Sequence, residues 1–565
     1  MSFENYAYIR PNEKEVEEKF QQALTKFEQA ATFEEQDNAM KEINAIRDDI
    51  DTMWNLCFIR HSIDTKDAFY KDEQEFFDEY DPVTDGYVTK FYNALLVSPF
   101  RQQLEDKYGA QLFKLAELEV KTYDDAVLED LQQENKLSSA YVELKASAQI
   151  EFEGNTYTLE QMQPLLEDAD RTRRQKASEA YNNFFADNQA QFDDIFDKLV
   201  KVRTKIARKL GFDNFVELGY ARMKRTDYNA EMVEVFRKQV EDIIVPVATK
   251  LRARQQERIG VDTLRFYDEG IAFKSGNATP KGEPEWIVEQ ATTMYKELSP
   301  ETDEFFTFMR ENDLMDLVAK PGKATGGFCT AIVNYDAPYI YANFNGTSGD
   351  VDVLTHEAGH AFQVYSSLHF DLPEYVSPTY EACEIHSMSM EFFTWPWMKN
   401  FFKEDIEKYY FGHLSGALLF IPYGVAVDEF QYVVYANPDF TPEERHQAWR
   451  EIEKKYLPHR NYEGNEYLEM GGFWQRQGHI YEDPFYYIDY TLAEICALQF
   501  WKKMRENRED TWKDYVELCK QGGSKSFVEL VKVANLISPF EDGCVASVIG
   551  EIDAYVSSID DKELG

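Results

Sequence analysis

This sequence has no closely spaced cysteine pair, and its first six residues are neither basic nor strongly apolar. Its six cysteines form no CxxC pair, a usage typical of proteins kept in a reducing cytosol. Residues 1–6 supply neither a basic region nor an apolar core, so we expect no secretion signal there. These absences predict a cytoplasmic protein. The cysteines lie at positions 57, 329, 383, 496, 519 and 544.

Long apolar runs and basic residues are also scarce. The most apolar stretch, residues 416–427, is short and broken by Pro422, so we expect it not to span a bilayer. The 60 Lys and Arg against 103 Asp and Glu give a net charge of −43. Such a balance argues against nucleic acid, whose phosphates need basic side chains, and against anionic membrane surfaces. We therefore predict neither nucleic-acid nor membrane partners.

Core-forming residues, in contrast, are plentiful. The chain has 565 residues, of which 44% are hydrophobic and 15% aromatic, enough for two or three ordinary domains. Helical apolar periods occur in residues 12–80 and again in residues 192–210, where the period ends at Gly211. Residues 275–284 have the clearest loop composition. Pattern and composition alone predict a large, mostly α-helical protein.

The HExxH pattern of residues 356–360 is the most informative feature of the chain. On a helix, residues i and i+4 lie on one face, so His356 and His360 can bind one metal ion. Glu357 is then placed beside the metal, where its carboxylate can accept a proton from metal-bound water. Apolar residues flank the pattern, as in a buried helix. The alternative is two unrelated histidines on an ordinary helix.

A third metal ligand is predicted on the next helix. Residues 379–393 are rich in helix formers and free of Gly and Pro, with Ser377 as a possible N-cap. Glu384 is the predicted ligand, and three protein ligands leave the fourth zinc position for water. Glu391, nearly two turns later on the same face, is a candidate partner that orients a ligand histidine. Glu381 is the fallback ligand, and solvated surface carboxylates are the alternative.

One zinc ion per chain is therefore expected, bound by His356, His360 and Glu384. Two other histidines are predicted not to be ligands. His386 points roughly 200° away from Glu384 on the same helix. His369 falls on the far side of the first helix, if that helix extends so far.

The one clear strand signal precedes the HExxH helix. Residues 331–333 and 339–341 are β-prone runs, and residues 334–338 between them have a turn composition. We predict a small hairpin whose edge either binds peptide backbone by strand addition or only covers the core. Cys329 lies here too. Its thiol could react with oxidants or heavy metals, but a buried structural thiol is the more common case.

These motifs resemble those of a known family. The HExxH pattern, followed 24 residues later by Glu384, is similar to the zinc site of the thimet oligopeptidase and oligoendopeptidase F family, which includes the bacterial Pz-peptidases. Residues 343–352, which lead into the first helix, also resemble oligoendopeptidase F. The resemblance is specific over residues 326–490 and weaker at residues 170–181 and 199–223.

The resemblance implies both a fold and an activity. The implied fold is mostly α, with two helical lobes enclosing a deep substrate channel, zincin-type active-site helices and one small β-sheet near the zinc. We place a helical N-terminal lobe at residues 1–195 and a zinc metallopeptidase catalytic region at residues 196–565. The implied activity is hydrolysis of internal bonds in short unstructured peptides. Glu357 would activate zinc-bound water and then pass the proton to the leaving amine.

The same comparison draws attention to a third segment. The family uses a histidine and tyrosines here to bind substrate and stabilise the transition state, and His479 and Tyr490 match well. Tyr486 and Tyr487 compete for the intermediate position, and the sequence does not separate them. A phenol can donate to a developing oxyanion without carrying charge. We expect Asp483 to cap the helix that carries these tyrosines; aromatic packing is the alternative role for each of them.

Two other functional classes stay open. One is a different zinc peptidase, an aminopeptidase or carboxypeptidase of similar helical architecture. The other is a non-catalytic peptide-binding protein that keeps the metal for structure. Glu357 argues against the binder, because a structural site does not need that base. Short peptides are the expected partners, whereas the oligomeric state and the residue preference around the scissile bond do not follow from the sequence.

Overall fold

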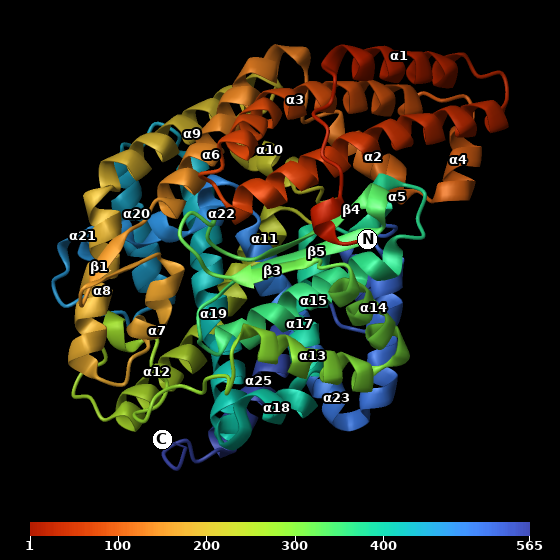
Figure 1. The fold of residues 1–565 in the computed structure, drawn as a ribbon. Helices are drawn as coiled ribbons and strands as arrows, with labels where there is room; N and C mark the ends of the chain where they lie inside the picture. The colour runs from red at the N-terminus through yellow and green to blue at the C-terminus, as the bar shows by residue number, and fades with distance from the viewer. Residues whose placement is uncertain (565) are drawn as a thin grey trace.

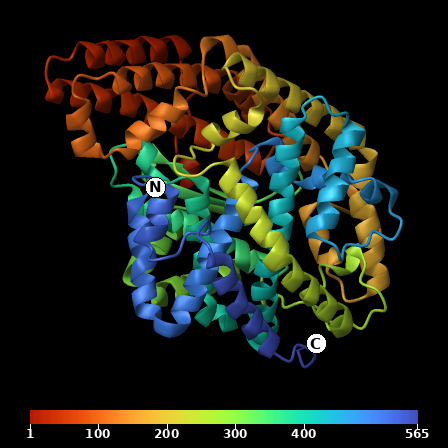
Figure 2. The same ribbon diagram turned by 180° about the vertical axis from the view of Figure 1, so that it is seen from behind.

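Helices make up most of the molecule in the computed structural model, which describes residues 1–564. The N-terminal helices, coloured red to orange, lie across the top of Figure 1, above a small central sheet and the remaining helices. The view from behind shows the C-terminus at the bottom of the molecule, far from the first helices (Figure 2). The predicted mostly α fold is confirmed.

Amphipathic helices build the N-terminal part. In α1 the apolar face of Phe20, Leu24 and Phe27 is buried, and the Asn12 side chain caps the helix by accepting from the Glu15 amide. These faces form an apolar core separate from the main one. The helices are α1 (Glu13–Gln29), α2 (Phe33–Ile63), α3 (Ala68–Leu96), α4 (Arg101–Tyr108), α5 (Gln111–Glu119) and α6 (Leu128–Ala146).

The helices that follow match two sequence predictions. The apolar period of residues 192–210 is α9, and Gly211 follows with a positive φ of 90°. Residues 275–283 are non-helical, and α13 begins at Pro284. The predicted domain boundary at residue 195 falls inside α9 and stays a prediction. The helices are α7 (Gln163–Leu166), α8 (Arg171–Asp187), α9 (Gln189–Lys209), α10 (Phe215–Arg222), α11 (Ala230–Gln239), α12 (Val245–Ile259), α13 (Pro284–Leu298) and α14 (Pro300–Glu311).

The central sheet has the strand order β3-β5-β4. The predicted hairpin is present: β4 (Phe328–Ile332) and β5 (Ala337–Phe344) pair antiparallel. The third strand, β3 (Met315–Val318), pairs parallel with β5 and was not predicted, because four residues carry too little pattern. A separate hairpin of β1 (Ile150–Phe152) and β2 (Asn155–Tyr157) was also missed.

Most helices after the sheet contribute to the main apolar core, which also takes side chains from the sheet and from α6 to α14. Helix α15 (Gly349–Ser367) packs against β5 and α17 (Tyr380–Phe393), and α17 packs in turn against α23 (Tyr487–Gln521). All three are largely buried, which fixes their relative positions. The other helices here are α16 (Pro373–Val376), α18 (Met398–Phe402), α19 (Ile406–Ala436), α20 (Pro442–Tyr456), α21 (Glu466–Glu469), α22 (Gly478–Tyr481), α24 (Phe527–Val533) and α25 (Cys544–Ser558).

Helix α19 corrects one expectation. We predicted that Pro422 would break the apolar stretch of residues 416–427. Instead, Pro422 lies inside α19, a continuous helix of 31 residues. Packing against α12, α20 and α23 compensates for the hydrogen bond that proline removes. By length and composition alone, Pro373–Ala436 contains a window apolar enough to cross a membrane. However, 56% of that window is buried inside the protein, as in a core helix.

The short helix α16, between α15 and α17, connects the two parts of the molecule. Leu372 and Tyr375 are buried in the N-terminal core rather than the main one. The Glu374 carboxylate lies 2.7 Å from the Arg47 guanidinium of α2 and accepts a hydrogen bond from the Tyr92 hydroxyl of α3. The segment joining the two central helices is therefore held by the N-terminal helices.

Candidate active site

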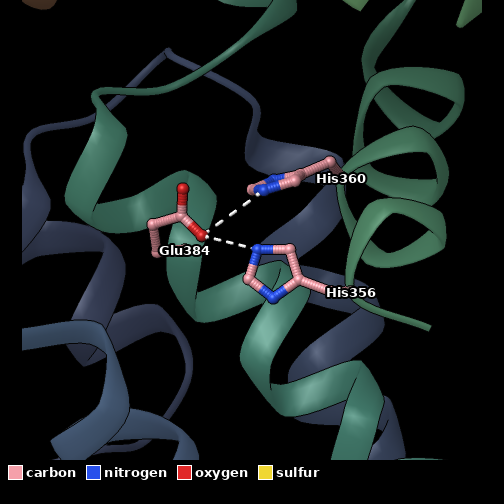
Figure 3. Close-up of side chains that lie close together, drawn as sticks. All are labelled: His356, His360 and Glu384. Atoms are coloured by element: carbon pink, nitrogen blue, oxygen red, sulfur yellow. Dashed lines mark ion pairs between the residues drawn. The ribbon is translucent and has the colours of Figure 1, made fainter. Parts of the chain in front are cut away.

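The three residues predicted as metal ligands meet in the interior. His356 and His360 extend from α15 toward Glu384 on α17 (Figure 3). The Glu384 Oε2 atom lies 3.1 Å from His356 Nε2 and 3.4 Å from His360 Nε2, and the donor atoms all lie within 4.8 Å of one another. Two ligands of a tetrahedral zinc ion are roughly 3.3 Å apart. The donor set and its spacing therefore fit zinc.

The glycine of the HExxH pattern explains how α17 comes so close. A Cβ atom on Gly359 would lie 2.6 Å from the His386 carbonyl oxygen and 2.6 Å from Ser387 Cα. Any larger residue at this position would push α17 away from α15. Since Glu384 precedes these contacts by less than one turn, the close approach at Gly359 is what brings its carboxylate to the histidines.

Glu357 is a buried carboxylate with a free oxygen. Its side chain is only 4% exposed, and its Oε2 atom has no hydrogen-bond partner among the described residues. Burial raises the pKa of Glu357, although His356 and His360 partly lower it. An unpartnered buried carboxylate costs free energy, and such costs are common at functional sites. The group has the basicity and the free lone pairs needed to accept a proton.

Glu391 connects the ligand His356 to a histidine that the sequence did not reveal. Its Oε1 atom lies 2.7 Å from His356 Nδ1, and its Oε2 atom lies 2.8 Å from His413 Nε2 on α19. Burial raises the pKa of Glu391, but these two hydrogen bonds lower it overall. The ionised carboxylate accepts from both rings, which leaves His356 Nε2 free to face Glu384. The Trp395 indole donates to His413 Nδ1 at 3.3 Å.

His413 carried no usable signal in the sequence. It stands alone among apolar residues of α19, without a metal-ligand spacing to another histidine. A lone histidine on an apolar helix is more often part of a packed core. The prediction that Glu391 contacts a ligand histidine agrees with its position, and its functional role stays a prediction.

The structure separates the two tyrosines that the sequence could not. The Tyr486 hydroxyl donates to Glu384 Oε1, the carboxylate oxygen turned away from the histidines. The Tyr490 hydroxyl lies 2.9 Å from His479 Nε2. The Tyr487 ring packs edge-on against Tyr423, His479 and Tyr490, without a hydrogen bond to Glu384 among the described residues. Tyr486 therefore faces the predicted ligand, while Tyr490 and His479 form a pair.

Burial sets the protonation of this pair. It lowers the pKa of His479 to about 4, so the ring is neutral near pH 7. It also raises the pKa of Tyr490 well above its usual value. Both groups are therefore neutral hydrogen-bond donors. Glu494, one turn after Tyr490, was not predicted; burial raises its pKa to about 8, and its Oε1 atom has no hydrogen-bond partner among residues 1–564.

The helix that carries these tyrosines begins later than predicted. We expected Asp483 to cap it, but α23 begins at Tyr487, and Phe485 has a positive φ of 71°. Two distant side chains hold this turn: Arg225 donates to the Phe485 carbonyl at 2.6 Å, and Gln431 accepts from its amide at 2.9 Å. Contacts from residues distant in the sequence thus override the local capping signal.

The remaining candidates lie away from the three donors. Glu381, the fallback ligand, accepts from the Thr379 hydroxyl at 2.9 Å. Thr379 also takes the N-cap position of α17 that we had predicted for Ser377. His386 is fully buried, and burial lowers its pKa to about 3. His369 is exposed. Neither histidine belongs to the donor group.

Two family models match the chain. A model described as the peptidase M3 N-terminal domain covers residues 3–123, and one described as peptidase family M3 covers residues 164–548. The chain belongs to peptidase family M3. Membership confirms the predicted family and makes this protein a metalloendopeptidase.

This M3 peptidase is similar in sequence and fold to several solved structures. It is 64% identical to Pz peptidase A, solved with an inhibitor, with a TM-score of 0.99 over 99% of this chain and all of that one. It is 63% identical to a protein from Bacillus anthracis str. Ames named for oligoendopeptidase F, with a TM-score of 0.94 over 100% and 99% of the two chains. A third structure, also named for oligoendopeptidase F, is 61% identical over the full length of both chains, with a TM-score of 0.99.

One curated relative is more distant. The oligoendopeptidase F homolog of Borreliella burgdorferi is 28% identical over 220 residues, which is 37% of this chain and 36% of that protein. The match thus spans about a third of the curated relative. It agrees with the family assignment and adds nothing on substrates.

Two cavities approach the donor group of this M3 peptidase. One of about 670 Å³ is lined by His479, Tyr490 and Glu391. Another of about 630 Å³ is lined by residues of the β4 edge, including Cys329, and by Tyr380, whose ring stacks on Tyr486. Burial raises the pKa of Cys329 well above its usual value, so its thiol is poorly reactive.

Proposed function

We propose that this M3 peptidase is a zinc-dependent oligoendopeptidase that hydrolyses internal bonds of short, unstructured peptides. In this proposal His356, His360 and Glu384 hold one zinc ion, and Glu357 is the general base. The observation that carries it is the meeting of three donor atoms beside a buried carboxylate with a free oxygen. A purely structural metal site would not need that carboxylate.

Bound zinc supplies a Lewis acid that acidifies a water molecule and polarises the peptide carbonyl. Glu357 takes the proton of the attacking water on its free oxygen. Its raised pKa makes it a stronger base than an exposed glutamate and a competent acid afterwards. The same carboxyl group then delivers the proton to the leaving nitrogen. Glu391, supported by His413, orients His356.

His479 and Tyr490 supply neutral donors toward the negative charge that develops on the carbonyl oxygen. Neutral donors suit this role, because they stabilise the oxyanion without binding an anion in the ground state. Tyr486 has a different part in the proposal. Its hydrogen bond to Glu384 Oε1 keeps the other oxygen, Oε2, directed at the histidines. Tyr487 has no part in the chemistry.

The substrate class follows from the surroundings of the site. One cavity is lined by His479, Tyr490 and Glu391, and another by the β4 edge and Tyr380; cavities of this size beside the site suit an extended peptide. The names of the relatives, Pz peptidase and oligoendopeptidase F, point the same way. Peptides of about ten residues should be cut internally, whereas folded proteins should resist because the reacting atoms are enclosed.

Metal analysis tests the ligand set. Purified protein should contain about one zinc per chain, and His356→Ala and Glu384→Ala should each lose it, because two ligands make an incomplete site. Glu381→Ala is the matched control and should keep its zinc. Full occupancy in Glu384→Ala would overturn the third-ligand assignment and promote Glu381.

Peptide cleavage tests the reaction class. A peptide of about ten residues blocked at both ends should be cut internally, a result that an aminopeptidase or a carboxypeptidase could not produce. The same sequence grafted into an exposed loop of a stable protein should stay intact. Equal cleavage of both would rule out an enclosed site while leaving the zinc chemistry untouched.

A further inference from the structure

A glutamine amide lies directly behind His479. Gln477 stands just before α22, and its Nε2 atom is 2.9 Å from His479 Nδ1. The Tyr423 hydroxyl of α19 donates to Gln477 Oε1 at 2.9 Å. On the opposite side of the imidazole, His479 Nε2 lies 2.9 Å from the Tyr490 hydroxyl. The four side chains form a row from Tyr423 to Tyr490.

The direction of the hydrogen bonds in this row determines which ring nitrogen of His479 carries the proton. A neutral imidazole carries one ring proton, on either Nδ1 or Nε2, and the nitrogen without it is an acceptor. Because Tyr423 donates to the amide oxygen of Gln477, the amide NH2 group faces Nδ1 and donates to it. Nδ1 must then be the acceptor, and the ring proton lies on Nε2.

We propose that Gln477, oriented by Tyr423, is a positioning residue that keeps the ring proton of His479 on Nε2, the nitrogen that faces the Tyr490 hydroxyl. This inference rests on the proposed function, in which His479 donates to the developing oxyanion. Gln477 does not touch the substrate or the metal site. With the opposite tautomer, His479 would present a lone pair to negative charge and repel it.

The surroundings hold the amide in place. The Gln477 backbone amide donates to the Trp474 carbonyl at 2.9 Å, which fixes the chain just before His479. The Tyr423 ring makes edge contacts with the rings of Trp449, Phe473 and Tyr487. These contacts leave the Tyr423 hydroxyl directed at Gln477, so the amide has a fixed orientation.

Steady-state kinetics of the zinc-loaded enzyme give the first test. Gln477→Leu keeps the approximate size and removes the donor, and it should lower kcat by about tenfold or more with KM changed by less than about twofold. Tyr423→Phe removes only the orienting hydroxyl, so its loss should go in the same direction and be smaller. A wild-type kcat in Gln477→Leu would overturn the inference.

A double-mutant cycle separates positioning from general support of the fold. If Gln477 acts through His479, Gln477→Leu should cost nothing further in a His479→Ala background. The same fold loss in both backgrounds would overturn the inference. A wild-type kcat in His479→Ala would instead remove the donor role from the proposed function, and this inference with it.

Nitrogen NMR of the full chain, labelled in histidine, locates the proton directly. The His479 signals, assigned by their loss in His479→Ala, should show the proton on Nε2 in the wild type. Gln477→Leu should shift the signals toward a tautomer mixture. A wild-type proton on Nδ1 would overturn the inference even if every kinetic result agreed with it. This outcome is read from the wild-type protein and does not depend on how Gln477→Leu folds.

Discussion

The two walls of the active site are built in different ways. The metal side consists of α15 and α17, packed backbone to backbone at Gly359 inside the main core. On the facing side, α23 also packs against α17, but the side chains from His479 to Tyr490 are aligned by hydrogen bonds: Tyr486 to Glu384, His479 to Tyr490, and Gln477 to His479. A side chain added at Gly359 would meet backbone atoms that cannot yield, whereas hydrogen bonds can be removed singly. Substitutions on the metal side should therefore cause severe losses of activity, whereas those on the facing side should cause graded losses.

The largest effect is expected from Glu357→Gln. The amide keeps the shape of the carboxylate but cannot take a proton, so kcat should fall by about 10²–10⁴-fold. Zinc content and thermal stability should stay at the wild-type values, as measured by metal analysis and melting. A variant that kept a tenth of the wild-type rate would show that Glu357 is not the general base.

The next largest losses of kcat are expected from substitutions on the facing side, and they should differ from residue to residue. Tyr490→Phe removes a proposed oxyanion donor and should lower kcat by about 10²–10³-fold with little change in KM. Tyr487→Phe is its matched control, since this ring lies beside Tyr423 and has no contact with Glu384 among the described hydrogen bonds. Equal losses in both variants would mean that the aromatic cluster acts through packing alone.

A smaller effect is expected from His413→Phe, which tests how far the metal side depends on hydrogen bonds. Without His413, Glu391 loses one of its two histidine partners, and zinc affinity should fall by about 10–100-fold. Chelator competition measures this, while kcat at saturating zinc should stay near the wild-type value. His369→Ala, at an exposed histidine away from the site, is the control. An unchanged zinc affinity in His413→Phe would mean that Glu391 orients His356 without help from His413.

The smallest effect on turnover is expected from Arg47→Met, in the N-terminal helices. It leaves the buried Glu374 without its ion partner, so the free energy of unfolding should fall by about 3 kcal/mol. Denaturant unfolding measures the loss, and kcat at a permissive temperature should change by less than about twofold. Adding Glu374→Gln should restore part of the stability. A large fall in kcat would mean that α16 transmits strain to the ligand helices.

What the sequence predicted correctly was local. The i,i+4 spacing of His356 and His360 and the turn between β4 and β5 are properties of a few adjacent residues, and the structure reproduces both. The β3 strand was missed because its pairing depends on β5, more than twenty residues away. The start of α23 was misplaced because Arg225, between α10 and α11, and Gln431, on α19, hold Phe485 in a turn.

Within the active site, too, the sequence did not reveal contacts that depend on distant residues. Glu384 could be predicted because it shares a face with Glu391 on the helix expected after the HExxH pattern, and the family resemblance agreed with that choice. The structure brings it to the histidines. His413 and Gln477 belong to no motif. His413 meets Glu391 of α17 only in the folded protein, and Gln477, although two residues from His479, is oriented by Tyr423 of the distant helix α19. Groups that support a catalytic residue are set by tertiary packing, which a single sequence does not display.

Helix α16 has a consequence for how this protein could be divided. It connects the two ligand-bearing helices, yet its buried residues Leu372 and Tyr375 belong to the N-terminal core, and Glu374 takes both partners from there. A catalytic half expressed alone would present two apolar side chains and an unpaired carboxylate on the loop that sets the spacing of its ligands. The N-terminal helices are thus not an interchangeable module, and the two halves must be inherited, expressed and engineered as one unit.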